Sequence, residues 1–129
     1  MAGDRRRRLG ASGEDAAVRW YLQGGHEVLA RNWRCAEGEI DLIARAPDGT
    51  IVICEVKTRT SDAFGSPFEA VTAAKQRRIR RLAARWLAQG HPALRGGRGP
   101  SPVDVRFDVA AVRVGERGAL SVEVLESAF

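Results

Sequence analysis

The sequence predicts a single α/β domain with a central mixed β-sheet flanked by helices, in the order α-β-β-β-α-β-β. A helical apolar stripe is followed by three short apolar runs, and a second helical segment separates these runs from two more. The length of 129 residues suits one domain with its own core. Its 44% apolar and 29% charged residues are ordinary for a globular protein.

The first helix is expected from about Ser12, a suitable N-cap, to Gln23, where two glycines end it. Residues 1–10 should precede it as a flexible basic arm, which either contacts phosphate or is a solvated tail. The domain proper then covers residues 11–129. Glu14 falls on the apolar stripe of this helix. Its carboxylate is either a ligand for a nearby site or a complement to the positive helix N-terminus.

Five strands and one further helix complete the expected fold. The strands are expected at 28–33, in a hairpin over 39–57, and at 105–114 and 120–125. Ser66, Pro67 and Glu69 form a capping box that predicts one helix from there to Gln89, ended by Gly90. Residues 90–102 are expected to form a flexible loop.

The hairpin carries charges that buried strands normally exclude. Asp41 lies in its first apolar run, and Glu55 and Lys57 lie in its second. An unpaired buried charge costs several kcal/mol per ion, so a partner or a metal is expected there. A three-residue Pro47–Gly49 loop would place Asp41 opposite Glu55 on one face, whereas a two-residue turn would separate them. We therefore predict the odd loop or a compensating bulge.

These residue types suit phosphodiester hydrolysis. Mg²⁺ binds carboxylate oxygens and several waters, so Asp41 and Glu55 could share such an ion, and Lys57 could act on water or phosphate. The alternative is an ion-pair ladder in which Glu39 pairs with Lys57. In that ladder Asp41 and Glu55 would repel each other unless a cation lay between them.

The positive charge is concentrated in the second helix. The chain has a formal charge of +5, which favours a polyanionic partner such as nucleic acid. The basic residues assigned to this role are Arg59, Lys75, Arg77, Arg78, Arg81 and Arg85. Lys75 interrupts an apolar stripe, where a lysine more often snorkels. A basic helix face is usually only solvated, but the segment from Lys75 to Arg98 contains no acid.

The sequence also excludes some classes of protein. No apolar run approaches the roughly 20 residues of a membrane span, and no apolar segment follows the basic N-terminus as in a secretory signal. Cys35 and Cys54 have neither metal-ligand nor redox spacing, so a reduced pair in the cytoplasm is expected.

Asp41 with Glu55-Val56-Lys57 resembles the PD-(D/E)xK motif of restriction-endonuclease-like nucleases. The chain more closely resembles the YraN-like bacterial family over roughly residues 9 to 114. The segments that carry this resemblance are Gly13-Glu14, Asn32-Trp33-Arg34, Gly38-Glu39-Ile40-Asp41-Leu42-Ile43, Glu55-Val56-Lys57-Thr58-Arg59, Phe64-Gly65, Glu69-Ala70-Val71, Lys75 and Arg106-Phe107-Asp108. Two departures are Ile40 in place of proline and Cys54 in place of a larger apolar residue.

The resemblance implies a restriction-endonuclease-like fold, similar to that of Holliday-junction resolvases. It implies that Asp41 and Glu55 are ligands of Mg²⁺ or Mn²⁺, with Glu14 as an auxiliary ligand. Lys57 would be the water- or phosphate-directed base. Glu39, which shares a strand face with Asp41, is a further auxiliary candidate whose role the resemblance does not imply.

The leading hypothesis is a metal-dependent nuclease on structured or branched DNA, with DNA favoured over RNA and a homodimer as one form. The second is a nucleic-acid-binding module without turnover. The third is a protein-interaction domain whose arginines meet an acidic partner. Fold resemblance does not establish function, so the substrate stays open.

Overall fold

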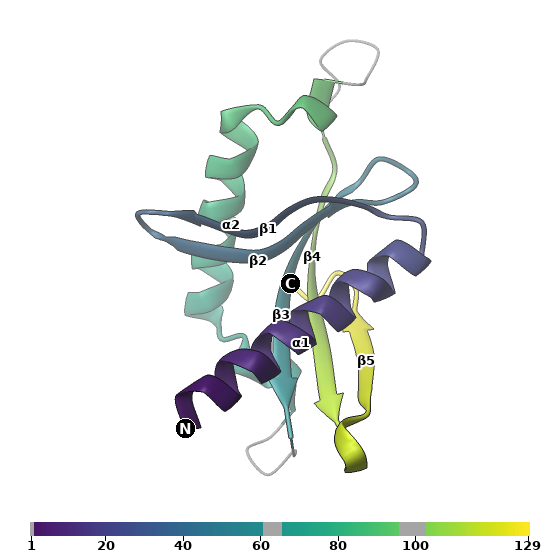
Figure 1. Ribbon diagram of the computed structural model, residues 1–129. Helices are drawn as coiled ribbons and strands as arrows, with labels where there is room; N and C mark the ends of the chain where they lie inside the picture. The colour runs from purple at the N-terminus through teal and green to yellow at the C-terminus, as the bar shows by residue number, and fades with distance from the viewer. Residues whose placement is uncertain (1, 61–65, 96–102) are drawn as a thin grey trace.

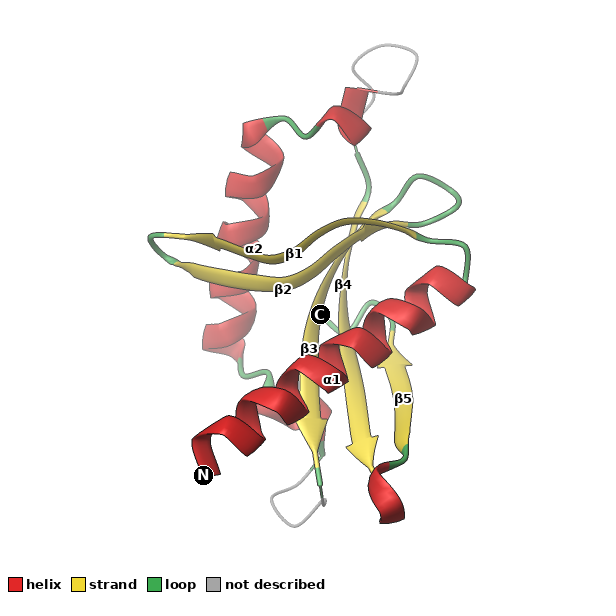
Figure 2. Cartoon of the chain, in the orientation of Figure 1, coloured by secondary structure: helices red, strands yellow, loops and turns green. Residues whose placement is uncertain are grey.

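The computed structural model describes residues 2–60, 66–95 and 103–129, and it contains a five-stranded mixed sheet with one long helix on each face (Figures 1 and 2). The helices are α1 (Ala2–Gln23) and α2 (Ala73–Gln89), and the strands are β1 (Glu27–Cys35), β2 (Gly38–Arg45), β3 (Ile51–Arg59), β4 (Val105–Val114) and β5 (Leu120–Leu125). The strands lie in chain order, with β3 and β4 parallel and the other neighbours antiparallel. The predicted class, element order and mixed sheet are confirmed.

Alternate strand residues form two cores on opposite faces of the sheet. Ile43, Ile51 and Ile53 pack against α2, which lies behind the sheet in Figure 1. Leu42, Ala44, Val52 and Cys54 pack against Ala17 and Tyr21 of α1, which crosses the front. This period of two is the one expected for strands buried on both faces.

The first helix begins earlier than predicted. It starts at Ala2 instead of Ser12, so the residues assigned to a basic arm continue the helix. Arginine is a good helix former and the segment has no proline, so these residues can extend the helical turns. The predicted end at Gln23 is correct, and Gly25 follows with a φ of 81°.

The single helix predicted from Ser66 to Gln89 is two elements. Ser66 and Pro67 begin a short 3₁₀ helix, Pro67–Ala70, in which the Ser66 hydroxyl accepts the Phe68 amide at 3.3 Å. Val71 then leaves helical geometry, and Thr72 caps α2 by accepting the Lys75 amide at 3.3 Å. Thr72 is thus the true N-cap of α2. Its C-terminus agrees with the prediction, with Gly90 left-handed.

The remaining boundaries differ little from the expected ones. β4 and β5 match residue for residue, whereas β1 is longer than the predicted 28–33. Within the expected loop 90–102, residues Pro92–Arg95 form a 3₁₀ turn. Residues 61–65, including Phe64, and 96–102 lie outside the described residues. Of the helices described, none is long and apolar enough to span a membrane.

Candidate active site

The β2–β3 hairpin has the register that the odd loop requires. Ala46 donates its amide to Thr50 across the Pro47–Gly49 loop at 2.8 Å. The paired residues then run from Arg45 with Ile51 to Leu42 with Cys54. Continued by one residue, this register brings Asp41 opposite Glu55, as predicted.

The two strands separate just where these carboxylates occur. The last pair between β2 and β3 is Leu42 with Cys54, although both strands continue beyond it. The amide of Val56 instead donates to Asp41 Oδ2 at 2.9 Å. Ile40 packs on the α2 side and Leu42 on the α1 side, so β2 does not alternate regularly across Asp41. The Asp41 side chain therefore occupies the place of a backbone acceptor at the opening.

Asp41 lies among other acids. The pKa of Asp41 is raised from 3.8 to about 7, first by burial and second by the negative charge of Glu55. The hydrogen bond from Val56 opposes this rise, and the charges of Glu14 and Glu39 add to it. Glu55, Glu14 and Glu39 thus all lie within electrostatic range of Asp41, and Glu55 is its strongest charged neighbour.

Lys57 is paired with Glu55 and not with Glu39. Its Nζ lies 3.2 Å from Glu55 Oε1, and each side chain is only 20% exposed. Glu39 binds Arg34 Nε at 2.8 Å on the adjacent strand. The ion-pair ladder between Glu39 and Lys57 is therefore wrong, because β2 has left β3 before it reaches Glu39.

A close helix–strand contact brings Glu14 to this opening. Gly13 is buried, and a Cβ atom at that position would lie 1.9 Å from Thr58 Oγ1 on β3. Only a glycine lets α1 approach the strand so closely. Glu14 follows directly, and Asn32 Nδ2 of β1 donates to its Oε2 at 3.2 Å. The signal in the sequence was a glycine and an asparagine at interior positions of a helix and a strand, where both residue types are disfavoured.

The site fits a hard cation as a pair of carboxylates and not as a set of three. Among the described residues, no group of three or more His, Cys, Asp or Glu side chains is arranged to hold a metal ion. Two carboxylates, Asp41 and Glu55, are chemically suited to Mg²⁺, which commonly keeps several waters and takes one or two protein carboxylates. The charge of Glu14 acts on Asp41, but Glu14 is not arranged with Asp41 and Glu55 as a third ligand.

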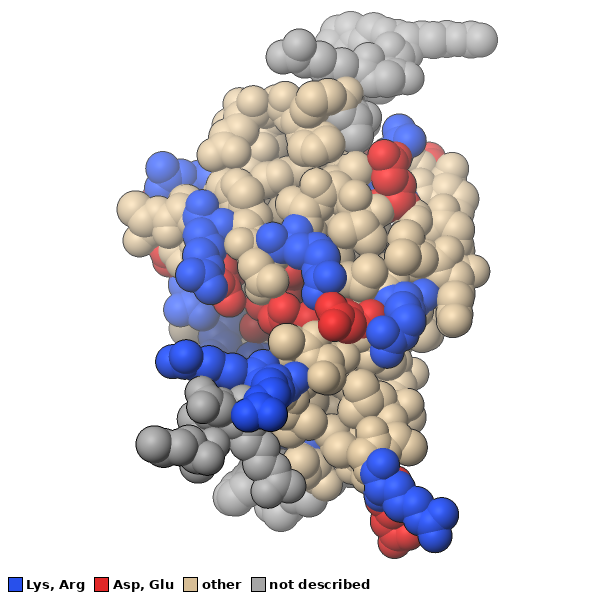
Figure 3. Space-filling view, viewed as in Figure 1, with Lys and Arg blue, Asp and Glu red and all other residues tan. Residues whose placement is uncertain are grey.

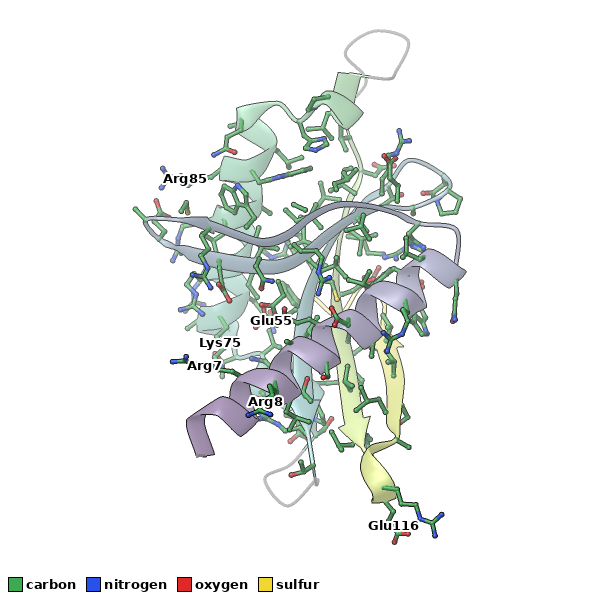
Figure 4. All side chains as sticks on the ribbon, in the orientation of Figure 1. Arg7, Arg8, Glu55, Lys75, Arg85 and Glu116 are labelled. Atoms are coloured by element: carbon green, nitrogen blue, oxygen red, sulfur yellow. The ribbon has the colours of Figure 1, made fainter. Side chains whose placement is uncertain are left out.

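Basic residues lie on both sides of the acids. In Figure 3 the acidic atoms gather across the middle of this face, with lysine and arginine atoms above and below them. Figure 4 shows Arg7 and Arg8 of α1 and Lys75 of α2 to one side of Glu55. The sequence did not predict this position of Arg7 and Arg8, because residues 1–10 were expected to form an arm and not part of a helix.

The predicted nucleic-acid residues differ in their surroundings. Arg77, Arg78 and Arg81 are exposed on α2. Arg85 forms an ion pair with Glu37 at the tip of the β1–β2 hairpin. Lys75 is half-buried and donates to the Ala70 carbonyl at 3.2 Å, while Arg59 is half-buried at the end of β3.

Asp108 is outside this site and serves the core. It is fully buried and accepts hydrogen bonds from Tyr21 Oη at 2.7 Å, Arg106 Nε at 2.9 Å and the Ser127 amide at 3.1 Å. Asp108 is thus a buried strand charge paired with Arg106.

Two surface hollows also lie elsewhere on the described surface. One of about 300 Å³ adjoins the β2–β3 turn, and one of about 250 Å³ lies between α1 and β5. Glu14, Asp41, Glu55 and Lys57 line neither hollow. The acids, and not these two hollows, form the candidate site, because the acids combine charge, partial burial and oxygen atoms that can bind a metal.

Fold and site together define an α/β protein with a carboxylate cluster where two central strands separate. The chain belongs to the Uncharacterised protein family UPF0102, whose sequence profile matches residues 13–112. This confirms the resemblance to the YraN-like family.

The relatives cover nearly the whole chain. A UPF0102 protein of Parafrankia sp. (strain EAN1pec) is 49% identical over 95% of this chain and 96% of its own. A UPF0102 protein of Beutenbergia cavernae is 52% identical over 91% and 92%. One from Mycolicibacterium vanbaalenii is 53% identical over 87% and 85%.

Proposed function

We propose that this protein is a divalent-metal-dependent nuclease that hydrolyses phosphodiester bonds in structured or branched DNA. One observation carries the proposal. Asp41 and Glu55 lie close together where β2 leaves β3, and Lys57 is paired with Glu55. A pair of carboxylates next to an ammonium group, partly buried yet reached by solvent, is suited to charge stabilisation at a phosphate.

Each side chain has a role in this proposal. Asp41 and Glu55 would hold Mg²⁺ or Mn²⁺, and Glu14 would be an auxiliary ligand. Such an ion, when bound, activates water and offsets negative charge on the phosphate. Lys57 would donate from Nζ to a non-bridging phosphate oxygen or take a proton from the attacking water. In the overall reaction, water oxygen forms a bond to phosphorus, one P–O ester bond breaks, and the leaving oxygen gains a proton.

The charge distribution supports a nucleic-acid substrate. Exposed Arg77, Arg78 and Arg81 lie on α2, and exposed Arg7 and Arg8 lie on α1. Basic groups to either side of a carboxylate site can bind phosphates that flank the scissile bond. The choice of DNA as substrate, and of branched DNA in particular, rests on the resemblance to Holliday-junction resolvases. That resemblance also brings a homodimer into the proposal, and sedimentation of the protein with and without a four-way junction tests it.

One observation favours a second function, that of a nucleic-acid-binding module without turnover. No three acidic side chains among the described residues are arranged for a metal, and Glu55 is already paired with Lys57. A pure binding module would use the same basic surface and would be indifferent to loss of Asp41.

Cleavage of labelled duplex, flap, four-way-junction and RNA substrates distinguishes the two functions. The proteins are the wild type, Glu55→Gln, Lys57→Met and Glu116→Gln, and each is assayed with Mg²⁺, with Mn²⁺ and with EDTA. Glu116 is an exposed acid far from Glu55 (Figure 4), so Glu116→Gln is the matched control.

We expect metal-dependent cleavage by the wild type and by Glu116→Gln, and losses of about 100-fold or more in the two site variants. Cleavage that survives both site substitutions would refute the assignment. Salt-sensitive binding without any cleavage, unchanged by Asp41→Ala, would establish the binding module instead.

A further inference from the structure

Asn32 lies on β1 between the two residues whose partners on β2 flank Asp41. On the β1–β2 ladder Arg31 pairs with Leu42 and Trp33 pairs with Ile40, so Asn32 is opposite Asp41. Asp41 in turn precedes the separation of β2 from β3. Asn32, Asp41 and Glu55 therefore occupy corresponding positions on three neighbouring strands.

The backbone of Asn32 is unusual for a strand interior. Its φ is 50°, in the left-handed region, while β1 continues on both sides. Non-glycine residues rarely adopt this conformation, and asparagine is one of the few that tolerates it. The turn of the backbone at this point accompanies the hydrogen bond from Asn32 Nδ2 to Glu14 Oε2, at 3.2 Å.

Stability does not explain this arrangement. A left-handed backbone is unfavourable for a non-glycine residue, and one exposed hydrogen bond contributes little, so the two effects oppose each other. A tether between β1 and α1 also exists one residue earlier, where Arg31 Nη2 binds Asp15 Oδ1 at 2.6 Å. What Asn32 adds is a direct hydrogen bond to the Glu14 carboxylate.

We propose that Asn32 is a positioning residue that holds the Glu14 carboxylate beside the opening, where its negative charge strengthens the binding of a divalent cation by Asp41 and Glu55. This inference rests on the proposed function. It follows from the hydrogen bond to Glu14 and from the place of Asn32 opposite Asp41. Groups that surround the metal ligands commonly change metal affinity 10- to 100-fold when removed.

The test variant is Asn32→Gly, because glycine keeps the left-handed backbone and removes only the amide. Arg31→Ala is the matched control, since it breaks the neighbouring tether to Asp15 and leaves Glu14 alone. Mn²⁺ binding is measured by titration calorimetry on the full chain, together with the Mn²⁺ concentration for half-maximal cleavage and the thermal unfolding midpoint.

We expect Asn32→Gly to weaken Mn²⁺ binding about tenfold and to raise the half-maximal Mn²⁺ concentration by the same factor, with little change in kcat at saturating Mn²⁺. Arg31→Ala should leave Mn²⁺ binding unchanged. In a Glu14→Gln background, Asn32→Gly should have no further effect on Mn²⁺ binding, because the two residues act through one contact.

The failures of the two proposals are distinguishable. A wild type that binds Mn²⁺ normally, with Asn32→Gly equal to it, overturns the role of Asn32 and leaves the proposed function intact. Equal weakening by Asn32→Gly and Arg31→Ala also overturns it, because a general loosening of β1 from α1 would then be the cause. A wild type that binds no Mn²⁺ overturns the proposed function and this inference with it.

Discussion

The carboxylate of Asp41 accepts the backbone amide of Val56 at 2.9 Å, at the point where β2 leaves β3. In a regular ladder that amide would meet a carbonyl of the neighbouring strand. Substitution of a side-chain carboxylate satisfies the amide and leaves the strands apart. The same contact fixes Asp41 beside Glu55, so the opening in the sheet and the acidic site have one structural cause.

The pH dependence of stability should report on Asp41. In metal-free protein its pKa is raised, mainly by burial and by Glu55, from 3.8 to about 7. The folded state thus binds this proton more tightly than the unfolded state, and the resulting stability, complete below about pH 4, is lost as pH rises through 7. We expect wild type to lose on the order of 2 kcal/mol more than Asp41→Asn between about pH 5 and pH 8, by urea unfolding in EDTA.

A divalent cation provides the companion measurement. If Asp41 and Glu55 bind Mn²⁺, then Mn²⁺ should raise the unfolding midpoint of wild type at about pH 8 and should have little effect on Asp41→Asn. Parallel pH profiles for wild type and Asp41→Asn in EDTA would contradict the raised pKa. Equal stabilisation of both proteins by Mn²⁺ would place the ion elsewhere.

The contact between Gly13 and Thr58 should be intolerant of any side chain. Gly13→Ala would put Cβ 1.9 Å from Thr58 Oγ1, so α1 must shift away from β3. We expect a loss of roughly 1 to 3 kcal/mol of unfolding free energy and a parallel loss of activity, because Glu14 moves with the helix. Gly10→Ala is the control in the same helix, since nothing lies within 4 Å of the added Cβ. It should be neutral or stabilising by up to about 1 kcal/mol.

The buried Asp108 cluster should contribute to stability and not to chemistry. Tyr21 is fully buried, and burial raises the pKa of its hydroxyl far above the usual value, so it remains a donor to Asp108. Tyr21→Phe should cost about 1.5 to 3 kcal/mol in chemical unfolding, the range for a hydrogen bond to a charged group. Arg45→Ala, which breaks the exposed pair with Glu27, should cost less than about 1 kcal/mol. Similar losses in both variants would contradict this account of Asp108.

The fold and the hairpin register could be predicted because local rules determine them. The odd Pro47–Gly49 loop fixes which residues of β2 and β3 face each other. The sequence also allowed a two-residue turn, and the odd loop was predicted because it would place Asp41 and Glu55 on one face. Gly90 and the apolar runs marked the ends of α2, β4 and β5 equally well. These features depend on turn chemistry and periodicity, which are visible in a short window.

The parts that failed depend on contacts between distant segments. The separation of β2 from β3 after Leu42 cannot be predicted from either strand alone, and it rules out the alternative in which Glu39 pairs with Lys57. Two residues can cap a helix in this segment. Ser66, the predicted N-cap, begins only the short 3₁₀ helix, and Thr72 is the N-cap of α2. The contact of Asn32 with Glu14 could not be predicted, because Glu14 lies on another element. The low strand propensity of asparagine was the only local sign.

The exposed arginines of α2 should set the salt dependence of nucleic-acid binding. Replacing Arg77, Arg78 and Arg81 together by alanine should lower the slope of log affinity against log salt by about 2 to 3, measured by fluorescence anisotropy on duplex DNA. Folding stability should change little, since all three side chains are exposed.

Arg80 and Arg117 provide two controls for that triple variant. The Arg80 guanidinium lies 4.7 Å from the Phe107 ring centroid, so Arg80→Ala should lower stability by about 0.5 to 1 kcal/mol with the salt slope nearly unchanged. Arg117 is an exposed arginine in the β4–β5 connection, and it follows Glu116, which lies far from Glu55 in Figure 4. If Arg117→Ala reduced the slope as much as any α2 arginine, net charge alone would govern binding. A defined surface on α2 requires that Arg117→Ala leave the slope unchanged, because only groups that meet phosphates release counterions.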